Sequence, residues 1–249
     1  MPDIDWNSAV WGGSYDWPAA GEEWSVAWGG SEAQWFGSLF PRLHRVFPAK
    51  RVLEIAPGFG RWSKFLVGAC ESYVGIDLSG KCVAACQSRF AAARHARFIQ
   101  NDGLSLEVAD GSFDFVFSFD SLVHAEIDVF RGYIPQIISK LAPTGAAFIH
   151  HSNLHATPNL AFNPHCRATS VDAEQIAALI GGNGGRVLIQ EVINWGGEVL
   201  CDCMTMFTRA DAPTAGLAPV VITNHHFMEE VALIKNVQSC YSGMKVGGR

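Results

Sequence analysis

The chain has 249 residues, of which 18 are Lys or Arg and 24 are Asp or Glu, so its formal net charge is −6 at pH 7. Hydrophobic residues make up 49% and charged residues 17%, which excludes an intrinsically disordered chain. The acidic balance argues against nucleic acid as a partner, because sequence-independent binding to it requires an excess of basic residues. The length suits one α/β domain, alone or with a small appendage.

The amino-terminal segment is unusually rich in tryptophan. Six of the eight tryptophans lie in the first 35 residues, at positions 6, 11, 17, 24, 28 and 35. Residues 22–47 look partly helical, and pairs of glycines follow Trp11 and Trp28. Two interpretations stay open at this point. The aromatic side chains form a packed amphipathic helix, or the segment is a lid with glycine hinges, in which Trp11 and Trp28 contact substrate.

From residue 51 onward, strand-like runs alternate with helix-length segments. The predicted strands cover residues 51–56, 72–77, 97–100, 113–119, 146–151, 186–193 and 199–207. The predicted helices cover residues 60–70, 79–94, 126–141 and 172–180, with a kink at Pro135 in the third. This alternation predicts an α/β, doubly wound, Rossmann-like and mostly parallel sheet of seven strands, with helices on both faces and an antiparallel pair at its edge.

The predicted division of the chain is a lid over residues 1–50, a ligand-binding domain over 51–210 and a tail over 211–249 that opens with a Pro/Ala linker. No signal peptide and no run of 18 apolar residues is visible, so we expect a cytoplasmic protein with no membrane partner. The seven cysteines contain no C-x2-C pair, which indicates structural thiols rather than a zinc site.

A glycine-containing turn follows the first predicted strand and opens the first helix of the domain. It carries Glu54, Ala56, Gly58 and Gly60, and small residues there let a ligand approach the backbone. Asp77 ends the second strand, 21 residues after Ala56, at a spacing that suits a carboxylate accepting hydrogen bonds from ribose hydroxyls.

The same turn disfavours a nicotinamide-dependent dehydrogenase. Aligned to the dinucleotide fingerprint, its third glycine position is Arg61, which is too large for close packing of helix against sheet.

The order Glu-x-Ala-x-Gly-x-Gly resembles motif I of class I S-adenosylmethionine-dependent methyltransferases, with Ala56 in place of the first glycine. Asn101-Asp102-Gly103 after the third strand and Phe119-Asp120 after the fourth match the same family. The strings LEIAPGFGRWSKFL, FSFDSLVHAE and FIHHSNL are similar to bacterial sugar O-methyltransferases of polysaccharide biosynthesis, in particular the mycobacterial methylmannose polysaccharide 1-O-methyltransferases. The resemblance covers residues 5 to about 210.

This resemblance implies binding of S-adenosyl-L-methionine and release of S-adenosyl-L-homocysteine. The residues that it assigns to the cofactor are Glu54, Ala56, Gly58, Gly60, Arg61, Asp77, Leu78, Asp102, Gly103 and Phe119. It implies a small saccharide as acceptor, for instance at the 1-hydroxyl of a 3-O-methylated mannoside. Whether the chain is a monomer or a homodimer stays open.

Methyl transfer to a sugar hydroxyl calls for a positioned base or a metal, because the hydroxyl is a weak nucleophile at neutral pH. The catalytic candidates are His124, His150, His151 and Asp120, all at expected strand ends. Neighbouring residues on a strand point to opposite faces, so His150 and His151 cannot both face one site, and the base stays open between His124 and His151. A competing model has Mg²⁺ held by Asp120, His151 and Asp202.

The predicted acceptor contacts lie after the later strands and in the lid. They are Trp11, Trp28, Asn153, Arg167, Glu191 and Trp195. Two alternatives remain at this level: a methyltransferase acting on a non-sugar small molecule, including an amine, and a protein that binds S-adenosylmethionine without catalysis.

Overall fold

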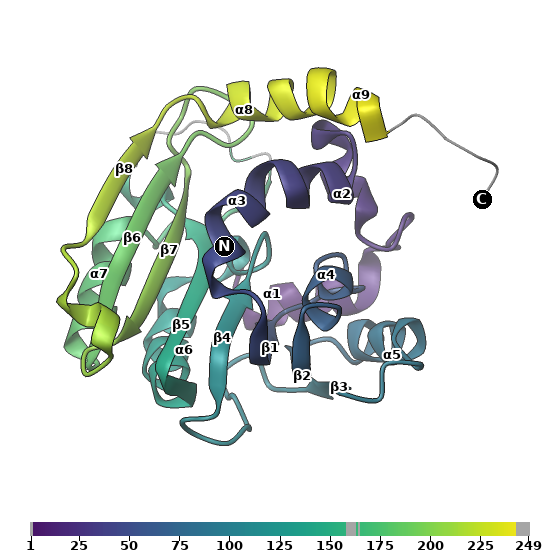
Figure 1. Cartoon of the computed structure of the whole chain (residues 1–249). Coiled ribbons are helices and arrows are strands. Elements are labelled where there is room, and N and C mark those ends of the chain that lie inside the picture. Colours follow the sequence, from purple (N-terminus) through teal and green to yellow (C-terminus); the bar gives the residue numbers. More distant parts are fainter. Residues whose placement is uncertain (1, 158–162, 164, 243–249) are drawn as a thin grey trace.

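The computed structural model describes residues 2–157, 163 and 165–242 (Figure 1). Within these residues one mixed sheet of eight strands has the order β3-β2-β1-β4-β5-β7-β6-β8. The strands are β1 (Ala49–Ile55), β2 (Cys70–Asp77), β3 (Ala96–Gln100), β4 (Phe113–Ser118), β5 (Leu141–Ser152), β6 (Gly185–Ile193), β7 (Asp202–Arg209) and β8 (Val220–Asn224). Only β7 runs antiparallel to its neighbours, β5 and β6. The doubly wound fold predicted from the sequence is confirmed.

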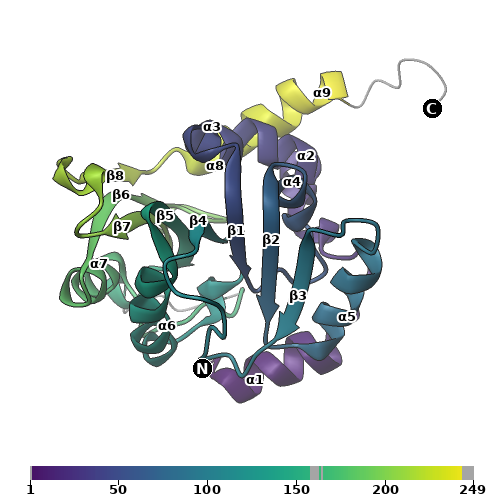
Figure 2. The ribbon, with the colours of Figure 1, turned by 60° about the horizontal axis from the view of Figure 1, so that its bottom comes forward.

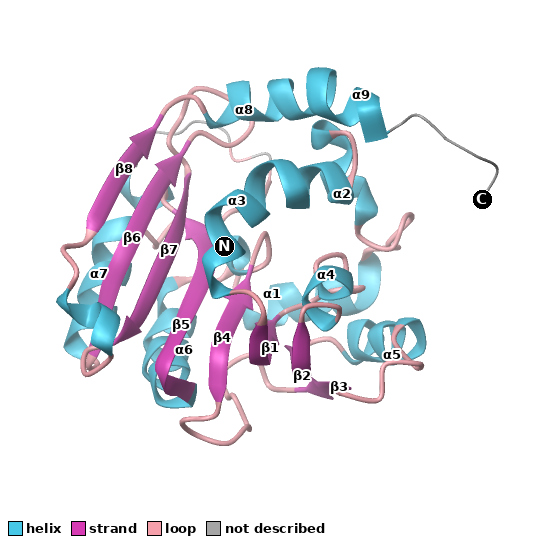
Figure 3. Ribbon diagram, in the orientation of Figure 1, coloured by secondary structure: helices cyan, strands magenta, loops and turns pink. Residues whose placement is uncertain are grey.

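Helices cover both faces of the sheet (Figures 2 and 3). One face packs against α6 (Ile127–Lys140) and α7 (Ala173–Gly182), and the other against α4 (Ser63–Val67), α5 (Gly80–Arg89) and parts of both terminal segments. Successive side chains of β4 point to opposite faces of the sheet: Phe115 and Phe117 belong to the hydrophobic core on one face, and Val116 belongs to the core on the other. Pro135 lies inside α6.

The sequence predicts seven strands with an antiparallel pair at the edge of the sheet. β6 and β7 do pair antiparallel, but the sheet has an eighth strand, so the pair does not form its edge. β7 lies between β5 and β6, and the edge strand is β8, which pairs parallel to β6. Val220, Val221 and Ile222 on β8 are all exposed, so the strand lacks the alternation of apolar and polar residues that marks a half-buried strand. The sheet therefore continues into the tail, beyond residue 210.

The tail also packs on the core through α8 (Phe227–Leu233), where Phe227 and Val231 are buried. After α8 the chain continues through residues 234–238 to α9 (Ser239–Ser242). None of the helices in the described ranges is long and apolar enough to cross a membrane.

The amino-terminal segment consists of short helical pieces, including α1 (Ile4–Ala9), α2 (Ser31–Gln34) and α3 (Phe40–Leu43). Trp28 and Trp35 are 2% and 3% exposed and belong to the core, as the packing interpretation predicts. Trp11, Trp17 and Trp24 instead lie over the carboxyl ends of the strands, where they line a cavity. Trp35 thus belongs to the core, Trp11, Trp17 and Trp24 belong to the cavity wall, and Trp28 belongs to both.

Candidate active site

A cavity of about 510 Å³ lies between the amino-terminal segment and the carboxyl ends of β1, β2 and β4. This edge is where ligands bind in doubly wound sheets, and the volume is typical of small-molecule sites. We call residues 2–28 the lid, because side chains from Ile4 to Trp28 form one wall of the cavity. The opposite wall comes from the strand ends and from the segment around Arg167 and Trp195.

The turn after β1 contains three small residues, Ala56, Gly58 and Gly60, each with a different structural role. Ala56 adopts φ +57°, a conformation that costs a residue with a Cβ about 1–2 kcal/mol. Hydrogen bonds hold it there: its N–H donates to Ile76 O at 2.7 Å, and its carbonyl accepts from Ser121 Oγ at 2.8 Å. Gly58 lines the cavity, whereas Gly60 packs against α5, where a Cβ would meet the Phe90 ring at 2.6 Å.

Asp77 ends β2 at the floor of the cavity. Its Oδ2 accepts from the Gly58 N–H at 2.9 Å and its Oδ1 from the Ser79 N–H at 2.8 Å. Burial raises the pKa of this carboxyl group to about 6, against the two backbone donors. Each oxygen keeps further lone pairs, so the carboxylate can still accept hydrogen bonds from a ligand.

Asn101, directly after β3, lines the cavity and carries a buried acceptor atom without a partner in the described ranges. Its Nδ2 donates to Ser105 O and to the Tyr133 hydroxyl, while its buried Oδ1 has no hydrogen-bond partner in the described part of the chain. A buried amide oxygen without a donor is costly, so this atom is suited to a ligand N–H group.

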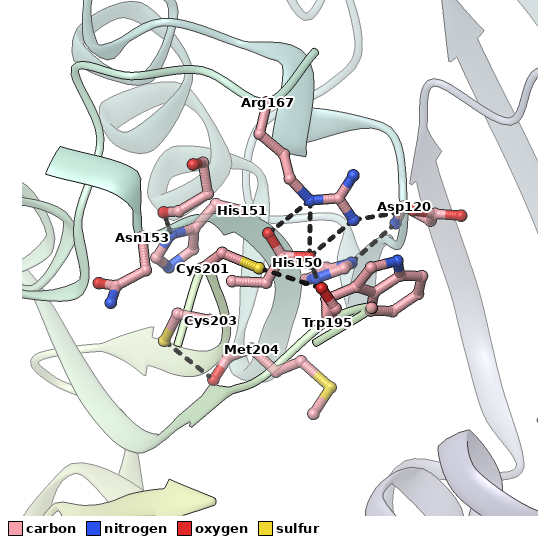
Figure 4. Close-up of polar contacts among 12 residues, drawn as sticks. Asp120, His150, His151, Asn153, Arg167, Trp195, Cys201, Cys203 and Met204 are labelled. Atoms are coloured by element: carbon pink, nitrogen blue, oxygen red, sulfur yellow. Dashed lines mark hydrogen bonds and ion pairs between the residues drawn. The ribbon is translucent and has the colours of Figure 1, made fainter. Parts of the chain in front are cut away.

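A chain of charged side chains lies beside the cavity (Figure 4). Asp120 accepts from Arg61 at 2.8 Å, and Asp202 accepts from the Arg167 guanidinium through both carboxylate oxygens. His150 bridges the two carboxylate residues: its Nδ1 accepts from the Asp120 N–H at 3.2 Å, which leaves Nε2–H to donate to Asp202 Oδ2 at 3.1 Å. The charges are compensated pairwise, as buried ions must be.

Two histidines, His124 and His165, line this cavity, and His124 has one ring nitrogen in a hydrogen bond. Its Nδ1 donates to the Cys166 carbonyl at 2.9 Å, which fixes the tautomer and leaves Nε2 as an acceptor without a partner among the described residues. Burial lowers the pKa of this imidazole to about 4. His124 lines the cavity beside Trp11, with their ring centroids 5.1 Å apart, and it is neutral at pH 7.

Residues 52–145 match the family model of a methyltransferase domain. The match spans β1 to β4 and the start of β5, and it includes the turn after β1 and Asp77. No curated protein matches the chain.

Three of the solved structures that match this chain share its fold. The PH0226 protein of Pyrococcus horikoshii is 19% identical over 69% of this chain and 88% of its own, with a TM-score of 0.56. The N-methyltransferase NodS of Bradyrhizobium japonicum, in complex with S-adenosylhomocysteine, is 18% identical over 69% and 85%, with a TM-score of 0.54. An S-adenosylmethionine-dependent methyltransferase of Clostridium acetobutylicum is 12% identical over 74% and 91%, with a TM-score of 0.57.

The structure brings most of the predicted cofactor residues to the wall of the cavity. These are Ala56, Gly58, Arg61, Asp77, Leu78, Gly103 and Phe119. Gly60 instead packs beneath the turn. The sequence missed Asn101, although it stands next to the predicted Asp102 and directly after the strand.

Two predicted cofactor contacts are corrected. Glu54 is 2% exposed and lies beneath the turn, where it accepts from Ser63 Oγ at 2.6 Å and from the Tyr73 hydroxyl. Asp102 is exposed and caps its own loop by accepting from the Leu104 and Ser105 N–H groups. Neither lines the cavity, because each carboxylate is already occupied by local donors.

His151 is removed from the candidate bases. Its ring lies on the other face of β5, against Phe130 of α6, with Nδ1 donating to Ser152 O and Nε2 bonded to Thr205 Oγ1. Figure 4 shows His151 and Asn153 turned away from Asp120 and Trp195. The alternation of side chains along β5 separates His151 from His150, which stacks on Phe119 as a support and does not line the cavity.

The predicted metal ligands Asp120, His151 and Asp202 are not brought together. The two aspartates are paired with arginines and His151 faces the opposite side of the sheet. In the described ranges, no group of three His, Cys, Asp or Glu side chains has the arrangement of a metal site.

Four predicted acceptor contacts line the cavity: Trp11, Trp28, Arg167 and Trp195. The rings of Trp28 and Trp195 lie 5.0 Å apart at its edge. Two others are corrected. The Asn153 side chain donates to Leu200 O and accepts from the Ala173 N–H. The Glu191 carboxylate forms an ion pair with Arg42 and accepts from Asn224.

Proposed function

We propose that this chain transfers the methyl group of S-adenosylmethionine to a hydroxyl of a small saccharide, with His124 as general base. The observation that carries the proposal is the free Nε2 of a neutral His124 in the cavity wall. A base whose pKa lies well below the working pH is fully in its acceptor form, although it is a weaker base than an ordinary histidine.

The cavity fits the cofactor on grounds independent of the reaction. The unpartnered Oδ1 of Asn101 suits the exocyclic amino group of adenine, and the Asp77 carboxylate suits the ribose hydroxyls. When bound, S-adenosylmethionine supplies an electrophilic methyl group on a sulfonium.

The chain's own residues would orient the acceptor and exclude water. Trp195 lines the cavity with its indole packed against that of the buried Trp28, and an indole face suits the apolar side of a pyranose ring. Arg167 is held by Asp202 through Nε and Nη2, so Nη1 remains to donate to an acceptor oxygen. His124 Nε2 would accept the hydroxyl proton as the new C–O bond forms.

The test is methyl transfer from labelled S-adenosylmethionine to a panel of mono- and oligosaccharides, with small amines in parallel. We expect a sugar methyl ether, and a loss of kcat of about 100-fold or more in His124→Ala, the usual contribution of a general base. The matched control is His44→Ala, at an exposed histidine outside the cavity. Between pH 5.5 and 8 the pH profile of kcat should show no fall caused by protonation of His124, because the pKa of His124, about 4, lies below that range.

If only amines are methylated, the proposed saccharide acceptor is wrong and the substrate is an amine. An unimpaired His124→Ala enzyme would remove this residue as the base.

A further inference from the structure

The cavity wall contains a small set of buried polar side-chain atoms without a partner in the described part of the chain. They are Asn101 Oδ1, Glu23 Oε2, Trp28 Nε1 and Trp62 Nε1. Three of the four belong to neutral groups. Glu23 is the exception, because its unpartnered atom carries part of a negative charge, and a buried charge without a partner is far more costly than a neutral group.

Glu23 is held in place by its other carboxylate oxygen. Oε1 accepts from the Tyr15 hydroxyl at 2.8 Å, and burial together with this bond keeps the pKa of Tyr15 above its usual value. The tyrosine ring packs against Trp24 at a centroid distance of 5.5 Å. The carboxylate is therefore positioned by the lid, with Oε2 left over.

The cations near Glu23 are already engaged elsewhere. The neighbouring Glu22 takes the ion pairs with Lys64 and Arg89, on the outer side of the lid. Arg61 donates to Asp120 at 2.8 Å and to Ser25 Oγ at 3.2 Å. Glu23 thus lines the cavity with a carboxylate oxygen that has no ion-pair partner in the described part of the chain.

Glu23 lies next to the turn that follows β1. Ser25, two residues further on, accepts from Arg61 of that turn, and a Cβ added at Gly21 would lie 3.6 Å from the Arg61 Cβ. Trp17 stacks on Phe59 at 4.5 Å and covers Gly58. Asp77 and Asn101 define the ribose and adenine positions of the proposed cofactor, so the end of the cavity at Glu23 is left for its methionine part.

We propose that Glu23 binds the α-ammonium group of the cofactor's methionine moiety through Oε2. The inference rests on the proposed binding of S-adenosylmethionine. It assigns the recognition of the ammonium to a side chain of the lid, in a charge-assisted hydrogen bond. The lid then contacts the amino-acid part of the cofactor.

The experiment measures Kd by calorimetry for two ligands and three proteins. The ligands are S-adenosylhomocysteine and its deamino analogue, which keeps the carboxylate and lacks the ammonium. The proteins are the full-length wild type, Glu23→Gln and the control Glu22→Gln, whose carboxylate lies outside the cavity. Thermal unfolding of each protein reports whether the fold is retained.

We expect Glu23→Gln to raise the Kd for S-adenosylhomocysteine by about tenfold or more, which corresponds to about 1.4 kcal/mol. The Kd for the deamino analogue should stay within about threefold of the wild-type value. In Glu22→Gln the ratio of the two dissociation constants should equal that of the wild type. An unchanged ratio in Glu23→Gln would falsify the inference.

Two further outcomes separate the hypotheses. If the wild type binds neither ligand, the proposed function fails along with the inference. If Glu23→Gln binds S-adenosylhomocysteine normally but loses methyl transfer, the carboxylate serves the acceptor and the inference is overturned while the proposed function stands.

Discussion

Glu54, near the end of β1, lies beneath the turn that lines the cavity. The motif places an acid at the end of β1, and the structure closes the turn over it, so the carboxyl group is fully buried with Ser63 and Tyr73 as donors. Burial raises its pKa to about 7. The group therefore favours its neutral form in the folded protein.

This setting predicts a pH dependence of stability. Because the folded pKa of about 7 exceeds the unfolded value of 4.5, the contribution of Glu54 is complete below pH 4.5, declines as the pH rises, and is lost above about 7. The loss is on the order of 3 kcal/mol. Chemical denaturation between pH 5 and 8.5 should show a smaller decline in Glu54→Gln than in the wild type.

The control is Glu71→Gln, an exposed glutamate on the neighbouring strand β2. Its decline should match that of the wild type, and an equal slope in Glu54→Gln would contradict the prediction. Asp77, whose pKa is also raised by burial, contributes with the same sign in all three proteins, so a smaller decline remains in Glu54→Gln.

Sequence reasoning located the edge of the sheet that carries the site, because strand ends and small-residue turns leave strong local patterns. The sequence alone does not show which of two adjacent residues points into the site. Asn101 and Asp102 are equally placed in the sequence, and hydrogen bonds within the loop turn Asp102 outward. His150 and His151 differ in the face they occupy, which depends on where β5 ends.

At the scale of elements, the lid is the part of the chain that the sequence described least well. Trp28 belongs to the core, so a truncation at residue 30 would damage the fold as well as the cavity. α1 contains no buried residue, and the chain as far as Asp16 contributes to the cavity rather than to the core.

Deleting residues 1–16 should therefore preserve the fold and impair function. We expect near-native circular dichroism and cooperative unfolding, with kcat/KM reduced by about 100-fold because the reacting groups lose their cover and alignment. Turnover of the truncated protein against the full chain is the measurement. Normal turnover would show that the lid is dispensable.

β8 and α8 show the limit of patterns for assigning elements. Strands β1 to β7 were predicted from apolar runs, whereas the exposed residues of β8 give no periodic signal. Its place in the sheet follows from pairing with β6, a contact between segments that sequence periodicity does not report.

At the scale of the whole molecule, the two terminal segments meet on one face of the sheet. Arg42 of α3 donates to Glu191 of β6 and to Glu230 of α8, each at 2.8 Å. Beside this network, Phe227 packs on Trp28 and Trp195, whose rings also line the cavity. The tail thus packs against the part of the cavity wall formed by Trp28 and Trp195, although the sequence shows no motif in the tail.

Phe227→Ala tests this support. Phe227 is fully buried, so its truncation should cost about 3–5 kcal/mol and lower Tm by roughly 6–20 °C for a chain of this size. The control on the same helix is Leu233→Ala, at a side chain that is 53% exposed and whose loss should cost within about 0.5 kcal/mol. Calorimetric unfolding of both variants decides the matter: equal, small shifts would mean that α8 lies on the molecule without stabilising it.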